Sequence, residues 1–436
     1  MTETAPLRLA IVGLGTVGAG VIKLLDVNRE LVARRAGRPI EVVAISARDR
    51  NKDRGVDLSP YEWVDDMASL ASRKDIDTVV ELIGGSDGPA LTLARLCLSQ
   101  GKPFVTANKA MIAHHGLDLA REAERTGVAL KYEAAVAGGV PVIKGLREGA
   151  AANRIMRVYG ILNGTCNYIL STMEKDGTAF ADVLDEAQAK GYAELDPTFD
   201  IDGIDAAHKL SILASLAFGT EIDFASVDIT GIRNVLAADI REAAVLGYRI
   251  RLVGMADCEA EGGENLGLFQ RVHPMLVPMS HPLAHVDGAL NAVVAEGNFV
   301  GRLFFQGAGA GEGPTASAVV ADIIDVARDE YGPAFAMPAE WLQRQVKADA
   351  GQRIGRVYLR FLVKDRPGVL AEITAAMRDA NVSIESVIQR AETADDGVLV
   401  AIVTHAVTLS CIDDTLRRLS GSESMIGEPV VMHILD

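Results

Sequence analysis

Residues 7–25 read LRLAIVGLGTVGAGVIKLL, a short apolar run followed by spaced glycines and an amphipathic segment. The run Leu7 to Val12 predicts a buried strand, and the segment after Gly18 predicts a helix. Gly13, Gly15 and Gly18 then occupy the turn between strand and helix, where glycine allows a tight bend and lets the helix N-terminus approach a pyrophosphate. The stretch therefore predicts a dinucleotide-binding unit.

The sequence after this unit continues to alternate between strand-like and helical patterns. The predicted strands are Ile40–Ile45, Thr78–Ile83 and Phe104–Thr106, and the predicted helices are Pro89–Ser99 and Met111–Arg125. Such alternation indicates an α/β fold with a doubly wound, Rossmann-like parallel sheet. We assign residues 1–130 to this nucleotide-binding domain.

The sequence changes near Lys131, where glycine-rich loops and strand-like runs replace the alternation. We expect a second, α+β domain over residues 131–305. A second glycine-rich loop, QGAGAGEGPTAS, then leads into a predicted helix at Ala316–Ala327. We therefore expect residues 306–340 to return to the first domain and close over its ligand, and the polar segment after Tyr331 to be a linker.

Residues 353–436 have a third pattern. The predicted strands are Val357–Val363, Val382–Ile388, Val398–Thr404 and Pro429–Leu435, with helices near Val369–Met377 and Ile412–Leu419. The order βαββαβ is typical of a compact ferredoxin-like module.

The composition limits the kind of partner. The chain has 436 residues and a formal net charge of -16, which argues against nucleic acid or an anionic membrane, because both attract a concentrated positive charge. No apolar run reaches the length of about 18 residues that a membrane span needs, and the N-terminus has no leader-like pattern. The four cysteines are far apart and suggest neither disulfides nor a zinc site, which fits a cytoplasmic enzyme of small molecules.

An acidic segment that ends in a helical pattern is the main candidate for chemistry. Residues 191–209 read GYAELDPTFDIDGIDAAHK. Asp205 and Lys209 are four positions apart, so on a helix they share one face and the aspartate keeps the lysine protonated. We interpret Glu194 and Lys209 as a substrate clamp with a proton donor. A solvated surface helix is the alternative.

Lys109 is a second candidate, because it follows a predicted strand in KPFVTANKA. Ligands of parallel sheets bind at the carboxyl ends of the strands. Hydride delivery to a carbonyl produces a developing alkoxide, which a fixed ammonium group stabilises or protonates. The pattern therefore predicts that Lys109 or Lys209 serves a hydride-transfer reaction, unless they are surface lysines.

The choice of dinucleotide depends on the end of the predicted strand EVVAIS. An NAD enzyme typically has an acid there for the ribose hydroxyls, but here Arg48, Arg50 and Lys52 follow. A cationic cluster without an acid favours the 2′-phosphate of NADP. Arg48 is the candidate residue, and NAD use stays open because a basic surface loop would look the same.

Two further motifs have weaker interpretations. In YEAAVAGGVP, Glu133 and nearby backbone carbonyls are the oxygen ligands that a hard cation prefers, although a tight structural loop is the commoner meaning. Cys166, in LNGTCNYIL, would be the nucleophile of an acylating aldehyde dehydrogenase, but no activating histidine lies near it in the sequence.

Six of these motifs, in this order, resemble those of homoserine dehydrogenases. They are GLGTVG, TANKA, YEAAVAGGVP, LNGTCNYIL, GYAELDPTFDIDGIDAAHKL and GAGAGEGPTASAV, and they extend from about residue 7 to 330. The segment KDRPGVLAEI in the last module resembles an ACT domain. The layout is similar to that of the longer monofunctional bacterial homoserine dehydrogenases.

The resemblance implies NAD(P)-dependent interconversion of L-homoserine and L-aspartate 4-semialdehyde, a step in threonine, methionine and isoleucine biosynthesis. It implies a catalytic and dimerisation role for residues 131–305, catalytic Lys109 and Lys209, and substrate binding by Glu194 and Asp205. The implied cofactor contacts are Gly13, Leu14, Gly15, Thr16, Val17, Gly18, Arg48, Lys109 and Gly311. The implied monovalent cation site, usually for sodium, consists of Glu133 with the carbonyls of Val136, Gly138 and Val140.

The chain departs from the family pattern at Cys166, where a threonine is usual, and at Glu312, where a carboxylate lies beside the glycine loop. ACT modules bind amino acids between paired copies, so the resemblance also implies feedback by L-threonine near Asp365–Gly368 and a homodimer or homotetramer. A non-catalytic amino-acid sensor is the alternative from another class of protein.

Overall fold

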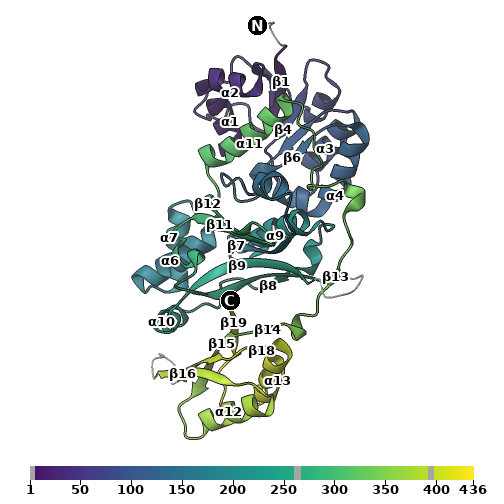
Figure 1. Ribbon diagram of the computed structural model, residues 1–436. Coiled ribbons are helices and arrows are strands. Elements are labelled where there is room, and N and C mark those ends of the chain that lie inside the picture. The colour runs from purple at the N-terminus through teal and green to yellow at the C-terminus, as the bar shows by residue number, and fades with distance from the viewer. Residues whose placement is uncertain (1–4, 260–266, 391–396) are drawn as a thin grey trace.

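The computed structural model describes residues 5–259, 267–390 and 397–436. Figure 1 shows three parts in a row, with a parallel sheet and its helices at one end, a mixed sheet in the middle and a small module at the other end. The N-terminus lies at the outer end of the first part, and the C-terminus lies between the mixed sheet and the small module (Figure 1).

The first part is a parallel sheet in the order β3-β2-β1-β4-β5-β6. Its strands are β1 (Leu7–Val12), β2 (Ile40–Ser46), β3 (Glu62–Trp63), β4 (Thr78–Glu81), β5 (Phe104–Thr106) and β6 (Leu130–Lys131). Its helices are α1 (Thr16–Val27), α2 (Arg29–Ala36), α3 (Pro89–Ser99), α4 (Lys109–Thr126) and α11 (Glu312–Ala327). This order is that of a doubly wound nucleotide-binding fold, so the predicted fold class is confirmed.

Helix α11 comes from much later in the chain and packs on α1 (Figure 1). The two helices approach closely at Gly20, where a Cβ atom would lie 2.7 Å from Cγ of Glu312. The Glu312 carboxylate binds the ammonium group of Lys23 at 2.7 Å. The residue that departs from the family pattern therefore forms an ion pair with α1.

The middle part is built on the strands β7 (Ile155–Ile161), β8 (Asp228–Ile229), β9 (Tyr248–Glu259), β10 (Gly267–Pro278), β11 (Leu290–Gly297) and β12 (Gly301–Ala308). Its helices are α5 (Val142–Lys144), α6 (Gly164–Asp176), α7 (Phe180–Ala189), α8 (Thr198–Ile201), α9 (Ile204–Phe218) and α10 (Ala237–Val245). Helix α9 contacts β7, β9 and β10 as well as α4 of the first part. Every residue of α9 from Asp205 to Leu216 is buried, which is typical of a helix enclosed on all sides.

The last part has the predicted order βαββαβ. Its elements are β15 (Val357–Lys364), α12 (Val369–Asp379), β16 (Ile384–Arg390), β17 (Gly397–Thr404), α13 (Leu409–Leu419) and β19 (Val430–Ile434). The short strands β14 (Ile354–Gly355) and β18 (Val407–Thr408) pair beside it. Strand β19 pairs with β15 on one side and with β10 on the other. The small module and the middle part therefore share one continuous sheet, in the order β12-β11-β7-β9-β10-β19-β15-β17-β16.

Several boundaries differ from the sequence prediction, and two of these differences have a clear local cause. Strand β4 ends at Glu81 rather than at Ile83, because the Glu81 carboxylate accepts hydrogen bonds from the amides of Ile83 and Gly84 and turns the chain. Helix α4 begins at Lys109 rather than at Met111, because the Asn108 side chain caps it by accepting from the Met111 amide.

The segment after Tyr331 is more ordered than a simple linker. Phe335 is buried, and β13 (Val346–Lys347) pairs with β10. Among the described residues, no helix is long and apolar enough to cross a membrane. Residues 1–4, 260–266 and 391–396 of the predicted domain ranges lie outside the described residues.

Candidate functional site

The glycine turn between β1 and α1 has the geometry that a bound pyrophosphate requires. Gly13 has φ +97°, and a Cβ atom there would lie 2.5 Å from the Leu82 carbonyl. A Cβ atom on Gly18 would lie 2.1 Å from the Gly13 oxygen, whereas one on Gly15 would meet nothing within 4 Å. Gly13 and Gly18 thus serve the turn and the helix packing, and Gly15 leaves open space next to the start of α1.

The second glycine loop ends at Gly311, which precedes α11 with φ +119°. This loop lies against the YEAAVAGGVP segment, since a Cβ atom on Gly138 would lie 2.5 Å from the Gly309 oxygen. The two segments that the sequence marks as glycine-rich are therefore packed together.

A buried carboxylate organises the carboxyl ends of the central strands. Glu81 at the end of β4 accepts from the Thr106 hydroxyl at 2.6 Å and from two amides of the loop that follows β4. Asn108 extends the network by donating to the Gly85 carbonyl at 2.7 Å. This network fixes the loop that precedes Lys109. It could not be predicted from the sequence, because Glu81 has the pattern of a strand residue.

Lys109 and Lys209 meet at one carboxylate. Lys109 Nζ lies 3.0 Å from Asp205 Oδ1, and Lys209 Nζ lies 2.7 Å from Asp205 Oδ2. Lys209 also donates to the Leu162 carbonyl at 2.7 Å. Lys109 is the first residue of α4 in the nucleotide-binding part and the other two lie on α9, so the contact of α4 with α9 brings the three side chains together.

Burial makes these charges interact strongly. The Asp205 and Lys209 side chains are only 6% and 10% exposed, and that of Lys109 is 33% exposed. Burial alone would raise the pKa of Asp205, but the two ammonium groups and the hydrogen bonds hold it well below its usual range. The negative charge of Asp205 in turn raises the pKa of Lys109. The site therefore holds an ionised aspartate beside a protonated lysine at neutral pH.

Asn163 and Asp200 complete the cluster, and the sequence reasoning missed both. The Asn163 amide donates to Asp205 Oδ2 and to Asp200 Oδ1, each at 2.8 Å. Its carbonyl oxygen accepts from the Cys166 amide and caps α6. Burial and the neighbouring Asp205 raise the pKa of Asp200. The capping pattern N-G-T-C in LNGTCNYIL was the available signal.

Glu194 has a looser position than Asp205. The residue is exposed, and among the described residues its carboxylate has no hydrogen-bond or ion-pair partner, while its backbone carbonyl accepts from Gln188 at 2.8 Å. Its charge nevertheless contributes to the raised pKa of Lys109. Glu194 therefore lies close enough to influence the site without contacting Lys209.

The basic loop after β2 is exposed at Arg48. Arg54, which the sequence reasoning did not select, donates from Nε to the Leu14 carbonyl at 2.9 Å and so ties this loop to the glycine turn. Arg50 and Arg54 both lie over the Trp63 ring, 5.8 and 5.7 Å from its centroid. The loop that contains Arg48 is thus tied to the glycine turn through Arg54.

The predicted cation ligands surround a strained turn. Ala137 and Gly138 have φ +55° and +49°, and the Glu133 carboxylate accepts from the amides of Ile143 and Lys144 at 3.0 and 2.8 Å. Burial raises the pKa of Glu133 to about 7. Among the described residues, no group of three or more His, Cys, Asp or Glu side chains is arranged to hold a metal ion, so a cation here would depend on backbone carbonyls.

Cys166 does not have the environment of a nucleophile. It is fully buried in the first turn of α6, and its Sγ donates to the Asp200 carbonyl at 3.2 Å. Burial raises the pKa of the thiol well above its usual value. A thiolate is the reactive form, so the geometry argues against acyl-enzyme chemistry.

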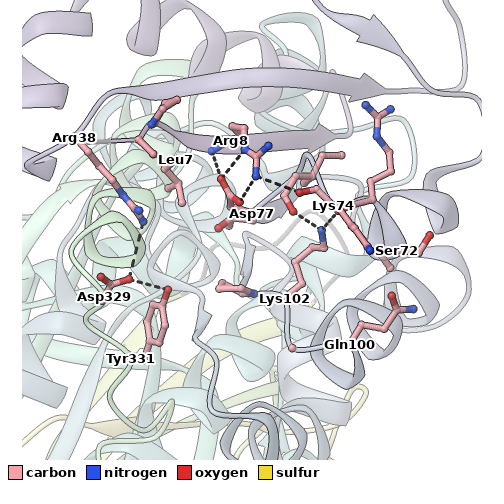
Figure 2. A pocket seen from close by; sticks show the side chains of 18 residues that line it. Leu7, Arg8, Arg38, Ser72, Lys74, Asp77, Gln100, Lys102, Asp329 and Tyr331 are labelled. Atoms are coloured by element: carbon pink, nitrogen blue, oxygen red, sulfur yellow. Dashed lines mark hydrogen bonds and ion pairs between the residues drawn. The ribbon is translucent and has the colours of Figure 1, made fainter. Parts of the chain in front are cut away.

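A cavity of about 900 Å³ lies at the opposite, amino-terminal edge of the parallel sheet, between the start of β1 and the segment before β5. Figure 2 shows that its charged groups are largely bound to one another. Arg8 donates to both oxygens of Asp77, and Lys102 donates to the carbonyls of Arg73 and Ile76. Since ligands of such sheets bind at the carboxyl ends of the strands, we assign this cavity no part in the chemistry.

Comparisons with known proteins agree with this geometry. Three family models match the chain: homoserine dehydrogenase, NAD binding domain over residues 13–133; homoserine dehydrogenase over residues 141–324; and ACT domain over residues 357–421. A homoserine dehydrogenase from Pseudomonas aeruginosa is 45% identical over 433 residues, which cover 98% of each chain.

Solved structures show the same fold. The crystal structure of a homoserine dehydrogenase from Thiobacillus denitrificans has a TM-score of 0.91 and 41% identity, and the match covers 99% of each chain. A hyperthermophilic archaeal homoserine dehydrogenase mutant in complex with NADPH has a TM-score of 0.63 and 26% identity, and the match covers 76% of this chain and 99% of that chain.

The fold and the site define an NAD(P)-dependent oxidoreductase with a C-terminal ACT domain. The chain belongs to the homoserine dehydrogenase family.

Proposed function

We propose that the chain interconverts L-homoserine and L-aspartate 4-semialdehyde with a nicotinamide dinucleotide. The observation that carries this proposal is the pair of ammonium groups on one buried carboxylate, 3.0 and 2.7 Å from Asp205. Fixed positive charge next to the carboxyl edge of a parallel sheet suits a reaction in which an alkoxide forms or is consumed. When bound, the nicotinamide supplies or accepts the hydride.

The residues then have separate roles. In the reducing direction, Lys209 Nζ donates the proton to the carbonyl oxygen, and the Lys109 ammonium group stabilises the developing negative charge. Asp205 and Glu194 bind the amino and hydroxyl end of the substrate. The raised pKa of Lys109 supports its charged form throughout the neutral range.

Absorbance at 340 nm with L-homoserine and each oxidised cofactor tests this proposal. We expect formation of the reduced cofactor that depends on homoserine, is unaffected by phosphate, and persists in Cys166→Ala. Dependence on phosphate together with loss of activity in Cys166→Ala would favour an acylating enzyme instead. Binding of homoserine without any reduction of cofactor would favour a sensor.

NADP is the proposed cofactor of preference, and NAD is the alternative. Arg48 is exposed in the loop that Arg54 ties to the glycine turn, which supports a contact with the 2′-phosphate, and Gly13 to Gly18, Lys109 and Gly311 would contact the rest of the molecule. NADPH is the ligand of the archaeal relative.

We also propose a monovalent cation, sodium rather than potassium, at the turn after Glu133. Val136 and Gly138 are buried, and among the described residues their carbonyl oxygens accept no hydrogen bond, so they and the Glu133 carboxylate fit a hard cation. Val140 would supply a further carbonyl. Replacing sodium chloride by choline chloride at equal ionic strength should lower Tm of the native protein, whereas Glu133→Gln should be insensitive to the exchange.

The ACT domain supports a small-molecule effector, for which L-threonine is our proposal. A cavity of about 360 Å³ lies at the turn between β15 and α12 and is lined by Asp365, Arg366 and Gly368. We propose a homodimer or homotetramer that pairs two such domains. Calorimetric titration with L-threonine that gave no heat, together with unchanged kinetics, would contradict the effector.

The proposed domain boundaries follow the three parts of the fold. They are 1–130 with 306–340 for cofactor binding, 131–305 for catalysis and dimerisation, and 353–436 for the ACT module. The return of α11 to α1 supports the first, and the βαββαβ order supports the last. Because the sheet is continuous, hydrogen bonds between β10 and β19 join the ACT module to the middle part.

A further inference from the structure

Two adjoining cavities lie where the middle sheet meets the ACT module. One, of about 240 Å³, is lined by residues of β9 and β10 and by the segment before β15. The other, of about 270 Å³, is lined by residues of β8, β10 and α13. Arg271 of β10 and His433 of β19 line both. The junction therefore has space for a small molecule, and the proposed reaction does not require one there.

Arg271 is an unusual residue for such a place. Its side chain is buried, with the residue 5% exposed, and its Nε has no hydrogen-bond partner in the part of the chain that the structure describes. Among the described residues, no carboxylate lies within 4.0 Å of its guanidinium nitrogens. Its guanidinium carbon lies over the Phe269 ring, 4.5 Å from the centroid. A buried charge without a partner is strongly disfavoured in proteins.

The other charged groups around the cavities are already engaged. Arg353 binds both oxygens of Asp257 at 2.6 and 2.5 Å and covers Phe269 at 3.8 Å. Arg356 binds Glu385 and lines the same cavity. Arg271 thus has no counter-charge among the described residues, whereas the neighbouring Arg353 and Arg356 each bind a carboxylate.

The remaining acids do not neutralise Arg271. Asp228 is paired with His273 at 3.1 Å, and Asp413 and Asp436 line the cavities without contacting Arg271. Burial lowers the pKa of Arg271 to about 10, although the negative charge of Asp228 opposes the shift. Burial and the nearby Arg271 also hold the pKa of His433 far below its usual value, so that ring is neutral and supplies no counter-charge.

We propose that Arg271 binds the oxyanion group of a small molecule, a carboxylate or a phosphate, in the junction between the catalytic sheet and the ACT module. The guanidinium fork matches both groups in a bidentate manner. This site is separate from the β15–α12 turn of the ACT domain and from the glycine turn of the nucleotide domain, with which it shares no lining residue. A ligand there contacts strands β10 and β19 together and therefore links the two parts of the chain.

Thermal unfolding of the full chain with inorganic phosphate or with acetate, against chloride at equal ionic strength, tests the proposal. We expect one or both anions to raise Tm saturably, by about 3 °C or more at a hundredfold excess over Kd. Response to phosphate alone identifies a phosphate ligand, and response to acetate alone identifies a carboxylate. A native protein that responds to neither anion overturns the proposal.

Arg271→Gln should abolish the response. The matched control is Arg38→Gln, because Arg38 also has a buried Nε without a partner but lies in the distant cavity of Figure 2. A response that survives in Arg271→Gln, or is lost in the control, overturns the proposal.

If Arg271→Gln does not fold, two measurements replace it. Arg271→Lys keeps the charge but loses the fork, and should weaken Kd at least tenfold. Crystals of the native protein soaked in selenate should show an anomalous peak within hydrogen-bond distance of the Arg271 guanidinium. Unchanged affinity in Arg271→Lys, or selenate bound only elsewhere, overturns the proposal.

Discussion

Lys109 at the start of helix α4 and Asp205 of helix α9 form an ion pair of 3.0 Å that joins the nucleotide-binding part of the chain to the middle part. Neither part alone contains the cluster, because Lys109 depends on the end of β5 and Asp205 on a helix packed against the mixed sheet. The site therefore forms only when the two parts are packed correctly.

Replacing Lys209 by alanine should lower kcat at least about a hundredfold, since the proton donor is lost, while the affinity for the cofactor stays similar. Stopped-flow and equilibrium cofactor titration measure the two quantities. Lys190→Ala is the control, because Lys190 pairs with Glu186 on the exposed face of α7. An equal loss of catalysis and of cofactor binding would mean that Lys209 has a structural role.

Asp205→Asn should move the alkaline limb of the pH profile of kcat/KM to lower pH. Asp205 raises the pKa of Lys109, so removing its charge lowers that pKa and the lysine loses its proton at a lower pH. The shift should be about one pH unit or more, since one unit corresponds to ~1.4 kcal/mol of interaction. Asp202→Asn is the control, because Asp202 pairs with the surface residue Arg233. An unchanged limb would show that Lys109 does not control it.

His208 should make the protein less stable in mild acid. Burial, with a smaller effect from His114, lowers its pKa from 6.5 to about 4, and its ring stacks on Phe224 at 4.3 Å. Between these two pKa values the unfolded state binds the proton and the folded state does not, so the free energy of unfolding falls as pH falls from 6.5 to 4.

The loss assigned to His208 is at most about 3 kcal/mol. Denaturant unfolding of the native protein and of His208→Gln at several pH values gives the free energy of unfolding as a function of pH. The difference between the slopes of the two curves measures this loss. The exposed His285 provides the control variant His285→Gln. Identical slopes for the native protein and His208→Gln would contradict the assignment.

Arg48→Ala should raise KM for NADP about tenfold and change KM for NAD less than about twofold, because a lost phosphate contact is worth on the order of 1–2 kcal/mol. Initial rates with each cofactor measure both values. Arg34→Ala, in the last turn of α2, is the control. Equal effects on the two cofactors would remove Arg48 from the recognition of the 2′-phosphate.

Much of the fold could be predicted because its signals are local. Short segments of sequence determine the glycine turn, the alternating strands and helices and the βαββαβ order. The structure contains these elements at nearly the predicted bounds. The pairing of Asp205 with Lys209 could be predicted for the same reason, because both residues lie on one face of a helix.

The site residues that could not be predicted bind partners that are far from them in the sequence. Glu81, Asn163 and Arg54 each bind groups on other elements, and nothing in their own segments indicates which polar groups lie opposite them. Arg271 is a stronger case. It lies in β10, where nearly every residue is buried, beside the ACT module whose strand β19 pairs with β10, and among the described residues its charge has no ion-pair partner.

Strand β19 is hydrogen-bonded to β10 through Met275 and Leu276 and to β15 through Val357 to Arg360. Two modules joined only by a flexible tether would tumble independently, but a shared ladder resists bending and permits mainly sliding along the strand direction. A change of shape in the C-terminal module would therefore reach the dehydrogenase core as a shear of β10, whose Val272 lies beside Gly203 at the start of α9. A movement of the ACT module is therefore transmitted through β19 and β10 to the catalytic part of the chain.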